Sequence, residues 1–134
     1  MEADYVSGLK DLAGFDRAWL IFWCHRASEA KMLVVPYRDT VERGLFATRA
    51  PARPNPLGLS CVRLLGIEGD VVRIGEVDIL DDTPLLDIKP YVPQYDNYAV
   101  RRCGWVDTAP DREVIADDRF EKPERKGNNG SSGD

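Results

Sequence analysis

Two apolar segments joined by a short turn constrain the fold of this chain more than any other feature. "LSCVRLLGI" (59–67) and "VVRIGEVDIL" (71–80) flank "EGD" at residues 68–70. Apolar, β-branched runs on both sides of a glycine-containing turn are typical of a β-hairpin. The sequence therefore predicts antiparallel strands here, and a sheet to which the other strands must pair.

Several further segments have strand character. "RAWLIFWCH" (17–25) is apolar throughout and predicts a strand buried on both faces, with Trp19, Phe22 and Trp23 in a core or an interface. Shorter strands are expected in "KMLVVPY" (31–37), "GLFAT" (44–48) and "TPLLDIKPYV" (83–92). Residues 4–14 place Val6, Leu9 and Leu12 on one helical face, which predicts a short N-terminal helix.

These elements indicate a mostly β protein, a small antiparallel β-barrel with a short N-terminal helix. The chain has 134 residues, enough for one domain, which we expect to span residues 1–107. Residues 108–134 have few apolar side chains and end in Gly, Asn and Ser. This composition predicts a disordered, flexible tail.

Composition excludes several classes of protein. The three cysteines form no CxxC pair and His25 is the single histidine, so we expect reduced thiols and no metal site. The longest apolar run, "AWLIFWC", is too short to span a bilayer, and the acidic N-terminus has no signal-peptide pattern. These features together predict a cytoplasmic protein without membrane partners.

The charges are unevenly placed. The net charge is −5, which argues against indiscriminate binding to nucleic acid. Residues 43–67 nevertheless carry four arginines and no acid, while residues 68–87 are strongly acidic. A basic patch within an acidic protein indicates a local anion site or a narrow contact with a charged partner.

The segment "RGLFATRAPARPNPLGLS" (43–60) carries most of this basic patch. Its prolines fix the backbone in advance, which lowers the entropic cost of binding a ligand near Arg49 and Arg53. Guanidinium groups match carboxylates and phosphates, and Gly58 allows a close approach to the backbone. The alternative is a solvated loop whose arginines pair with the acidic segment that follows.

Two further groups of polar residues are candidates for function. Asp87 and Lys89 share one face of a strand, with Ile88 opposite and Tyr91 continuing the polar row. The alternative interpretation is a surface ion pair on an edge strand. His25 and Arg26 follow the apolar strand, where side chains leave the core, although a single histidine there is often only the rim of the core.

Taken together, "FDRAWLIFWCHRAS", the arginine- and proline-rich loop and "VDILDDTPLLDIKPYVP" resemble the TsaA-like, or TrmO, family over residues 5–106. The resemblance implies a small β-barrel, unlike the Rossmann-type methyltransferases, that binds S-adenosylmethionine and acts as a homodimer. It also implies N6-methylation of threonylcarbamoyl-adenosine next to the tRNA anticodon, with the anticodon loop as partner.

The resemblance implies roles for individual residues. The residues matching the family's cofactor contacts are His25, Arg26, Arg49, Leu59, Gly75, Glu76, Val77 and Asp78. The residues matching its other motif positions, which we expect around the substrate, are Arg43, Arg53, Asn55, Asp87, Lys89 and Tyr91. Asp78, Asp87 and Tyr91 are candidates to accept the proton that the methylated nitrogen loses, with solvent as the alternative acceptor, and the sequence does not choose among them.

One part of the family pattern is missing. The family usually opens with a strand and a "PRQ" segment that also contacts the cofactor, whereas this sequence begins at the helix that follows. The missing segment favours a second interpretation, a non-catalytic barrel that holds S-adenosylmethionine or RNA. A third is a barrel of the same fold that acts on another nucleoside-like substrate. The intact motif from Arg49 to Ser60 favours the methyltransferase.

Overall fold

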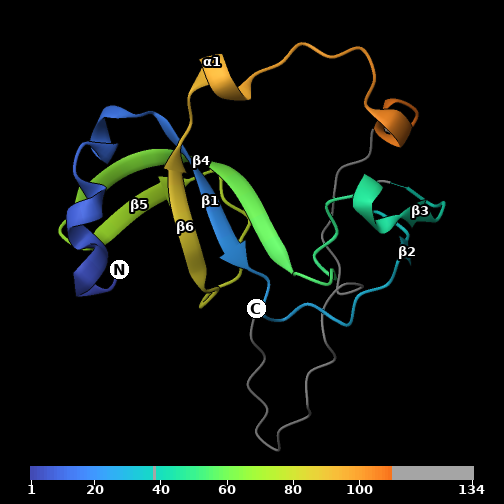
Figure 1. Cartoon of the computed structure of the whole chain (residues 1–134), viewed down its shortest axis with the longest axis horizontal. Coiled ribbons are helices and arrows are strands. Elements are labelled where there is room, and N and C mark those ends of the chain that lie inside the picture. Colours follow the sequence, from blue (N-terminus) through green and yellow to red (C-terminus); the bar gives the residue numbers. More distant parts are fainter. Residues whose placement is uncertain (38, 110–134) are drawn as a thin grey trace, which may run out of the picture.

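The computed structural model describes residues 1–37 and 39–109. The predicted tail of residues 108–134 lies outside this part of the chain except for its first two residues. The predicted barrel domain of residues 1–107 is described apart from position 38. Figure 1 shows a twisted sheet flanked by the N-terminal helices on one side and a small lobe around β2 and β3 on the other.

The sheet contains four strands, β1 (Arg17–Trp23), β4 (Leu57–Glu68), β5 (Val71–Gly75) and β6 (Leu85–Pro90). Their order is β5-β4-β1-β6, and every neighbouring pair is antiparallel. The predicted β4–β5 hairpin is confirmed, and its turn contains Gly69 with a φ of 60°. Among the described strands, β5 and β6 form the edges of the sheet, so the closed barrel remains a prediction.

One face of the sheet carries the core. Ala18, Leu20 and Phe22 alternate along β1 and are buried, together with Val62 of β4. Leu9, from the N-terminal segment, packs over one half of this face, as does Leu12. The opposite face of β1 is partly open, since Trp23 is 47% exposed. The prediction that this strand is buried on both faces is therefore wrong.

The N-terminal helix differs from the continuous helix expected over residues 4–14. Two 3-10 helices take its place, η1 (Ala3–Leu9) and η2 (Leu12–Gly14). Asp11 has a φ of 69°, in the left-handed region, and so interrupts the helix between them. Leu9 and Leu12 still face the core, as the periodicity indicated.

The two strands predicted in residues 31–48 are largely wrong. β2 (Leu33–Val34) and β3 (Arg43–Gly44) form only a short antiparallel pair, because Pro36 lies two residues beyond the end of β2. A 3-10 helix, η3 (Leu45–Ala47), replaces most of the "GLFAT" strand. The Leu45 carbonyl at the start of this helix accepts hydrogen bonds from nearby residues: the Thr48 hydroxyl and the Arg53 guanidinium both donate to it.

The remaining helices are short. α1 (Pro93–Asp96) follows β6, and the 3-10 helix η4 (Gly104–Asp107) packs near η3 through a hydrogen bond from Trp105 Nε1 to Ala47 O of 2.7 Å. The strand predicted to run to residue 80 ends at Gly75, because Glu76 has a φ of 56° and turns the chain away from the ladder. None of the helices in the described part of the chain is long and apolar enough to cross a membrane.

Gly58 provides a test of the packing where β4 begins. A Cβ atom at this position would lie 2.0 Å from Cε2 of the buried Phe22 ring. We expect Gly58→Ala to lower the free energy of unfolding by about 1–3 kcal/mol, the usual cost of overpacking a core. Urea denaturation measures this change.

Gly66 is the matched control on the same strand. In the described part of the chain, no atom outside Gly66 and its two chain neighbours lies within 4 Å of the position its Cβ would take. Gly66→Ala should therefore be neutral or slightly stabilising, since glycine inside a strand costs conformational entropy. Equal melting behaviour of the two variants would contradict the packing described around Phe22.

Candidate functional site

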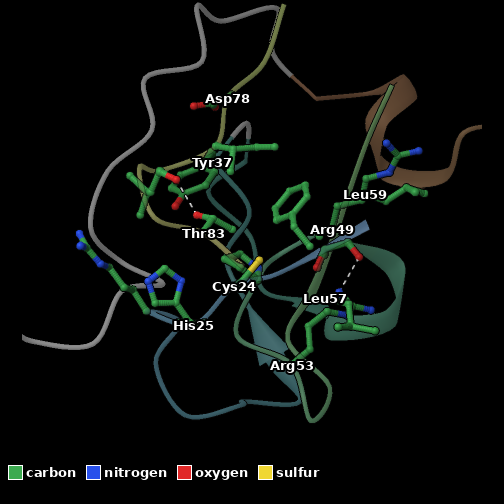
Figure 2. A pocket seen from close by; sticks show the side chains of 17 residues that line it. Cys24, His25, Tyr37, Arg49, Arg53, Leu57, Leu59, Asp78 and Thr83 are labelled. Atoms are coloured by element: carbon green, nitrogen blue, oxygen red, sulfur yellow. Dashed lines mark hydrogen bonds between the residues drawn. The ribbon is translucent and has the colours of Figure 1, made fainter. Parts of the chain in front are cut away.

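A cavity of about 490 Å³ lies where β1 ends and β4 begins. Backbone hydrogen bonds hold three segments together at this point. Cys24 N donates to Pro56 O at 2.7 Å, and Trp23 N donates to Pro84 O at 2.9 Å. The cavity therefore collects side chains from the end of β1, the proline-rich loop, the start of β4 and the loop that leads to β6 (Figure 2).

The register of the sheet explains why this end is open. Gly75 pairs with Arg63, so β5 stops there and residues 57–62 of β4 continue beyond it. The loop of residues 76–84 follows β5, and its residues Ile79, Leu80 and Thr83 line the cavity together with Leu57 and Leu59. Phe22 adds a further apolar side chain. The result is a largely apolar hollow with polar groups at its margin.

Two arginines of the proline-rich loop line the cavity in different ways. Arg53 Nη1 donates hydrogen bonds to three carbonyls, at 2.9 Å to Thr48 and 3.2 Å to both Leu45 and Ala50. Arg53 thus fixes the shape of the loop. Arg49 is exposed and makes no hydrogen bond or ion pair with any described residue. Its guanidinium is therefore available for an anion.

The remaining polar groups lie around the margin. Figure 2 shows Asp78 and Arg53 at opposite sides of the cavity. Thr83 Oγ1 donates to Leu80 O at 2.6 Å, which fixes the turn before β6. The Cys24 thiol also lines the cavity, and its burial raises its pKa, so this thiol is less readily ionised than an exposed one.

The structure brings some of the predicted site residues together and leaves others apart. The cavity is lined by His25, Arg26, Arg49, Leu59 and Asp78 from the predicted cofactor set, and by Arg53 from the predicted substrate set. These residues come from four separate segments of the sequence. Their roles in binding remain predictions, but their convergence on one hollow is a feature of the fold.

Glu76 and its neighbours do not line the cavity. The Glu76 carboxylate binds Arg17 at 2.6 Å and lies 4.0 Å from Arg63. This hydrogen bond raises the pKa of Arg17. Gly75 pairs with Arg63 in the sheet, and Val77 is exposed outside the hollow. The predicted cofactor segment Gly75–Asp78 therefore reaches the cavity only through Asp78.

The polar row on β6 also lies away from the cavity. Asp87 Oδ2 is 3.4 Å from Lys89 Nζ, and both side chains are more than half exposed on this edge strand. Ile88 packs into the core on the other face, as the alternation predicted. Tyr91 stacks edge-on against Trp19, with ring centroids 6.0 Å apart. This row has the geometry of a surface ion pair.

Arg43 and Asn55 likewise do not line the cavity. Arg43 Nε donates to Asp39 Oδ2 at 2.7 Å, and this contact lowers the pKa of the Asp39 carboxyl. The Arg43 guanidinium also lies 6.0 Å from the Trp105 ring. Asn55 is exposed, and its carbonyl accepts the Leu57 N–H at the start of β4.

Sequence analysis missed several residues of this site. Tyr37, Leu80 and Thr83 line the cavity, although none of them was predicted to bind a ligand. Leu80 and Thr83 lie within the quoted motif of residues 77–93, which was the available signal, but they were taken as parts of strands. Within the described ranges, no group of three or more His, Cys, Asp or Glu side chains is placed to hold a metal ion.

Comparison with known proteins decides the family. The model of the tRNA-methyltransferase O N-terminal domain matches residues 1–97. The chain belongs to the TrmO family. A crystal structure of TrmO from Pseudomonas aeruginosa superposes with a TM-score of 0.60 at 42% sequence identity, covering 74% of this chain and 42% of that one. The antiparallel sheet is thus the TrmO fold.

Two curated relatives show how far the TrmO likeness extends. A probable S-adenosyl-L-methionine-binding protein of Pyrococcus abyssi is 52% identical over 104 residues, covering 78% of this chain and 56% of that protein. The tRNA (adenine(37)-N6)-methyltransferase of Escherichia coli is 33% identical over 121 residues, covering 84% of this chain and 50% of that enzyme. The chain spans about half the length of these TrmO relatives.

Proposed function

We propose that this chain binds S-adenosylmethionine in the cavity and methylates N6 of the threonylcarbamoyl-modified adenosine next to the tRNA anticodon. The observation that carries the proposal is the convergence of His25, Arg26, Arg49, Leu59 and Asp78 on one hollow. The names of the Pyrococcus and Escherichia relatives support the cofactor and the reaction, respectively.

The cavity suits the parts of S-adenosylmethionine. Its volume of about 490 Å³ is in the usual range of small-molecule sites. Apolar side chains such as Leu59 and Ile79 would hold the adenine, and the unpartnered Arg49 would bind the methionine carboxylate through two parallel hydrogen bonds. When bound, this cofactor supplies a methyl group on a positively charged sulfur.

The chain itself must align the acceptor nitrogen with that methyl group and remove a proton. Holding the two reactants in line supplies much of the rate in such a transfer. The N6 nitrogen must lose a proton, and a positioned carboxylate can accept it. Among the three candidates, Asp78 lines the cavity, whereas Asp87 on β6 and Tyr91 directly after β6 lie outside it. We therefore assign the proton acceptor to Asp78.

A non-catalytic binding protein is the second candidate function. Archaeal relatives carry names that mention only S-adenosyl-L-methionine binding. The chain also spans 56% of the Pyrococcus relative and 29% of one from Archaeoglobus fulgidus. Under this alternative, the cavity binds the cofactor but the chain transfers no methyl group to tRNA.

Calorimetric titration of the purified chain with S-adenosylmethionine tests the part shared by both candidates. We expect saturable binding and a rise in melting temperature. The absence of both would count against any cofactor role for the cavity. Mass spectrometry of tRNA nucleosides from cells that lack the protein separates the candidates, because only the methyltransferase predicts loss of the methylated nucleoside.

We also propose that the chain forms a homodimer. Exposed apolar side chains lie outside the cavity on β1 and on the neighbouring edge strand β6, namely Trp23, Leu85 and Leu86. Exposed apolar patches and open sheet edges are features that protein interfaces cover. Light scattering at tens of micromolar protein, roughly where weak interfaces dissociate, should give twice the monomer mass. A monomer alone would refute the dimer.

The proposed substrate also bears on the location of the protein in the cell. Since tRNA is the proposed partner, we propose that the chain works in the cytoplasm. Cell fractionation should recover it with the soluble tRNA-modifying activity, and recovery with membranes would contradict this location.

A further inference from the structure

A second hollow lies beside the cavity. It has a volume of about 480 Å³ and shares Tyr37, Thr48 and Arg49 with the first. The new walls come from η3 and η4, chiefly Phe46 and Trp105. A molecule occupying the cavity and one occupying this hollow would therefore meet along the wall formed by Thr48 and Arg49.

Two aromatic rings are displayed in this hollow without packing against each other. Phe46 is 75% exposed, an unusual position for a large apolar ring. Trp105 is fixed by its hydrogen bond to Ala47 O at 2.7 Å. Among the described residues, the Phe46 and Trp105 rings make no ring-to-ring contact, and Pro36 and Ala50 complete an apolar lining.

One arginine lies beside each of the two rings. The Arg53 guanidinium lies 5.6 Å from the Phe46 ring centroid, and that of Arg43 lies 6.0 Å from the Trp105 ring. Among the described residues, Arg49 has no partner and lines the hollow itself, and no acidic side chain lines it. Exposed aromatic rings beside arginines form the pattern that proteins use to bind unpaired bases and their phosphates.

We propose that this hollow, which we call the stacking hollow, binds an unpaired RNA base that flanks the adenosine to be methylated. The base stacks on Phe46, beside the Arg49 side chain that the hollow shares with the cavity. The inference rests on the proposed function, since it assumes that RNA is the substrate. It extends that function by assigning Phe46 and Trp105 to a base-binding subsite outside the cofactor cavity.

Phe46→Leu tests the stacking hollow, because leucine keeps an apolar side chain but removes the ring. The probe is an anticodon stem-loop RNA with the fluorescent base 2-aminopurine placed on either side of the target adenosine. We expect wild-type protein to quench the fluorescence at one of these positions. Phe46→Leu should remove that quenching and weaken RNA binding about tenfold, while affinity for S-adenosylmethionine stays unchanged.

Tyr5→Leu is the matched control, since Tyr5 is also an exposed aromatic residue but lies on η1, at the other side of the sheet (Figure 1). It should change neither RNA binding nor quenching. Phe46→Trp should retain both, because it restores a ring. Since Phe46 is exposed, the melting temperature of each variant should match wild type.

The outcomes separate the inference from the proposed function. If wild type binds the stem-loop and Phe46→Leu binds it equally with the same quenching, the stacking hollow is wrong and the proposed function stands. If wild-type protein binds no RNA while it binds S-adenosylmethionine, both the tRNA substrate and the hollow are overturned.

Discussion

Asp78→Asn should lower the rate of methyl transfer to tRNA by about 10²–10⁴-fold, the usual contribution of a positioned general base. Asparagine keeps the size of the side chain but cannot accept the proton that the N6 nitrogen loses. Asp78 is exposed at the margin of the cavity, so the substitution should leave the fold intact. Single-turnover rates at saturating cofactor and tRNA measure the effect.

Asp87→Asn is the control for this experiment. Asp87 lies on β6, 3.4 Å from Lys89 and outside the cavity, so its substitution should change the rate little. A fall in cofactor affinity in Asp78→Asn, with an unchanged rate at saturation, would make Asp78 a cofactor contact and refute its role as base. Equal rates together with equal cofactor affinity for wild type and Asp78→Asn would refute both roles.

Arg49→Lys should weaken S-adenosylmethionine binding by about 1.5–3 kcal/mol, the range for a hydrogen bond to a charged group. Lysine keeps the positive charge but loses the planar fork that matches a carboxylate. Arg49 is exposed and has no partner among the described residues, so the melting temperature should stay the same. Calorimetric titration of wild type and variant measures the difference.

Arg63→Lys is the matched control for Arg49. Arg63 lies on β4 outside the cavity, more than half exposed, and comes no closer than 4.0 Å to Glu76. Its substitution should be nearly silent in both binding and stability. If Arg49→Lys is equally silent, the arginine is a solvated loop residue, and the anion site is wrong.

The sequence predicted the sheet well where local patterns act alone. The β4–β5 hairpin follows from two apolar runs around Gly69, and β6 follows from the alternation that places Ile88 in the core. The "GLFAT" strand failed because Arg53, several residues downstream, collects the carbonyls of Leu45 and Thr48 and stabilises a 3-10 turn. Such a contact leaves no periodic signal.

The open face of β1 shows a second limit. A continuous apolar run indicates burial on both faces, but whether a second layer covers the outer face depends on the rest of the fold. In the described chain the side chains of Ala18, Leu20 and Phe22 are covered, while Trp23 is not. The apolar pattern of β1 alone could not distinguish a strand face that is buried in this chain from one that is exposed.

The site residues could be identified only from the family resemblance and the sheet topology together. Motif matching named His25, Arg49 and Asp78, but only the sheet order brings these distant segments to one cavity. Motif matching also grouped Glu76 with these residues. In the structure Glu76 has a positive φ, and its carboxylate binds Arg17 instead. Phe46 read as part of a strand, and its exposure beside Trp105 appears only in the folded chain.

The central claim is that this chain transfers a methyl group to adenosine in tRNA. Its most direct test incubates the purified chain with S-adenosylmethionine carrying a deuterated methyl group and with tRNA containing the threonylcarbamoyl-modified nucleoside. Mass spectrometry of the digested tRNA should then show that nucleoside heavier by one deuterated methyl group. An unchanged nucleoside, from protein that binds the cofactor by calorimetry, would contradict the claim and leave a binding protein in its place.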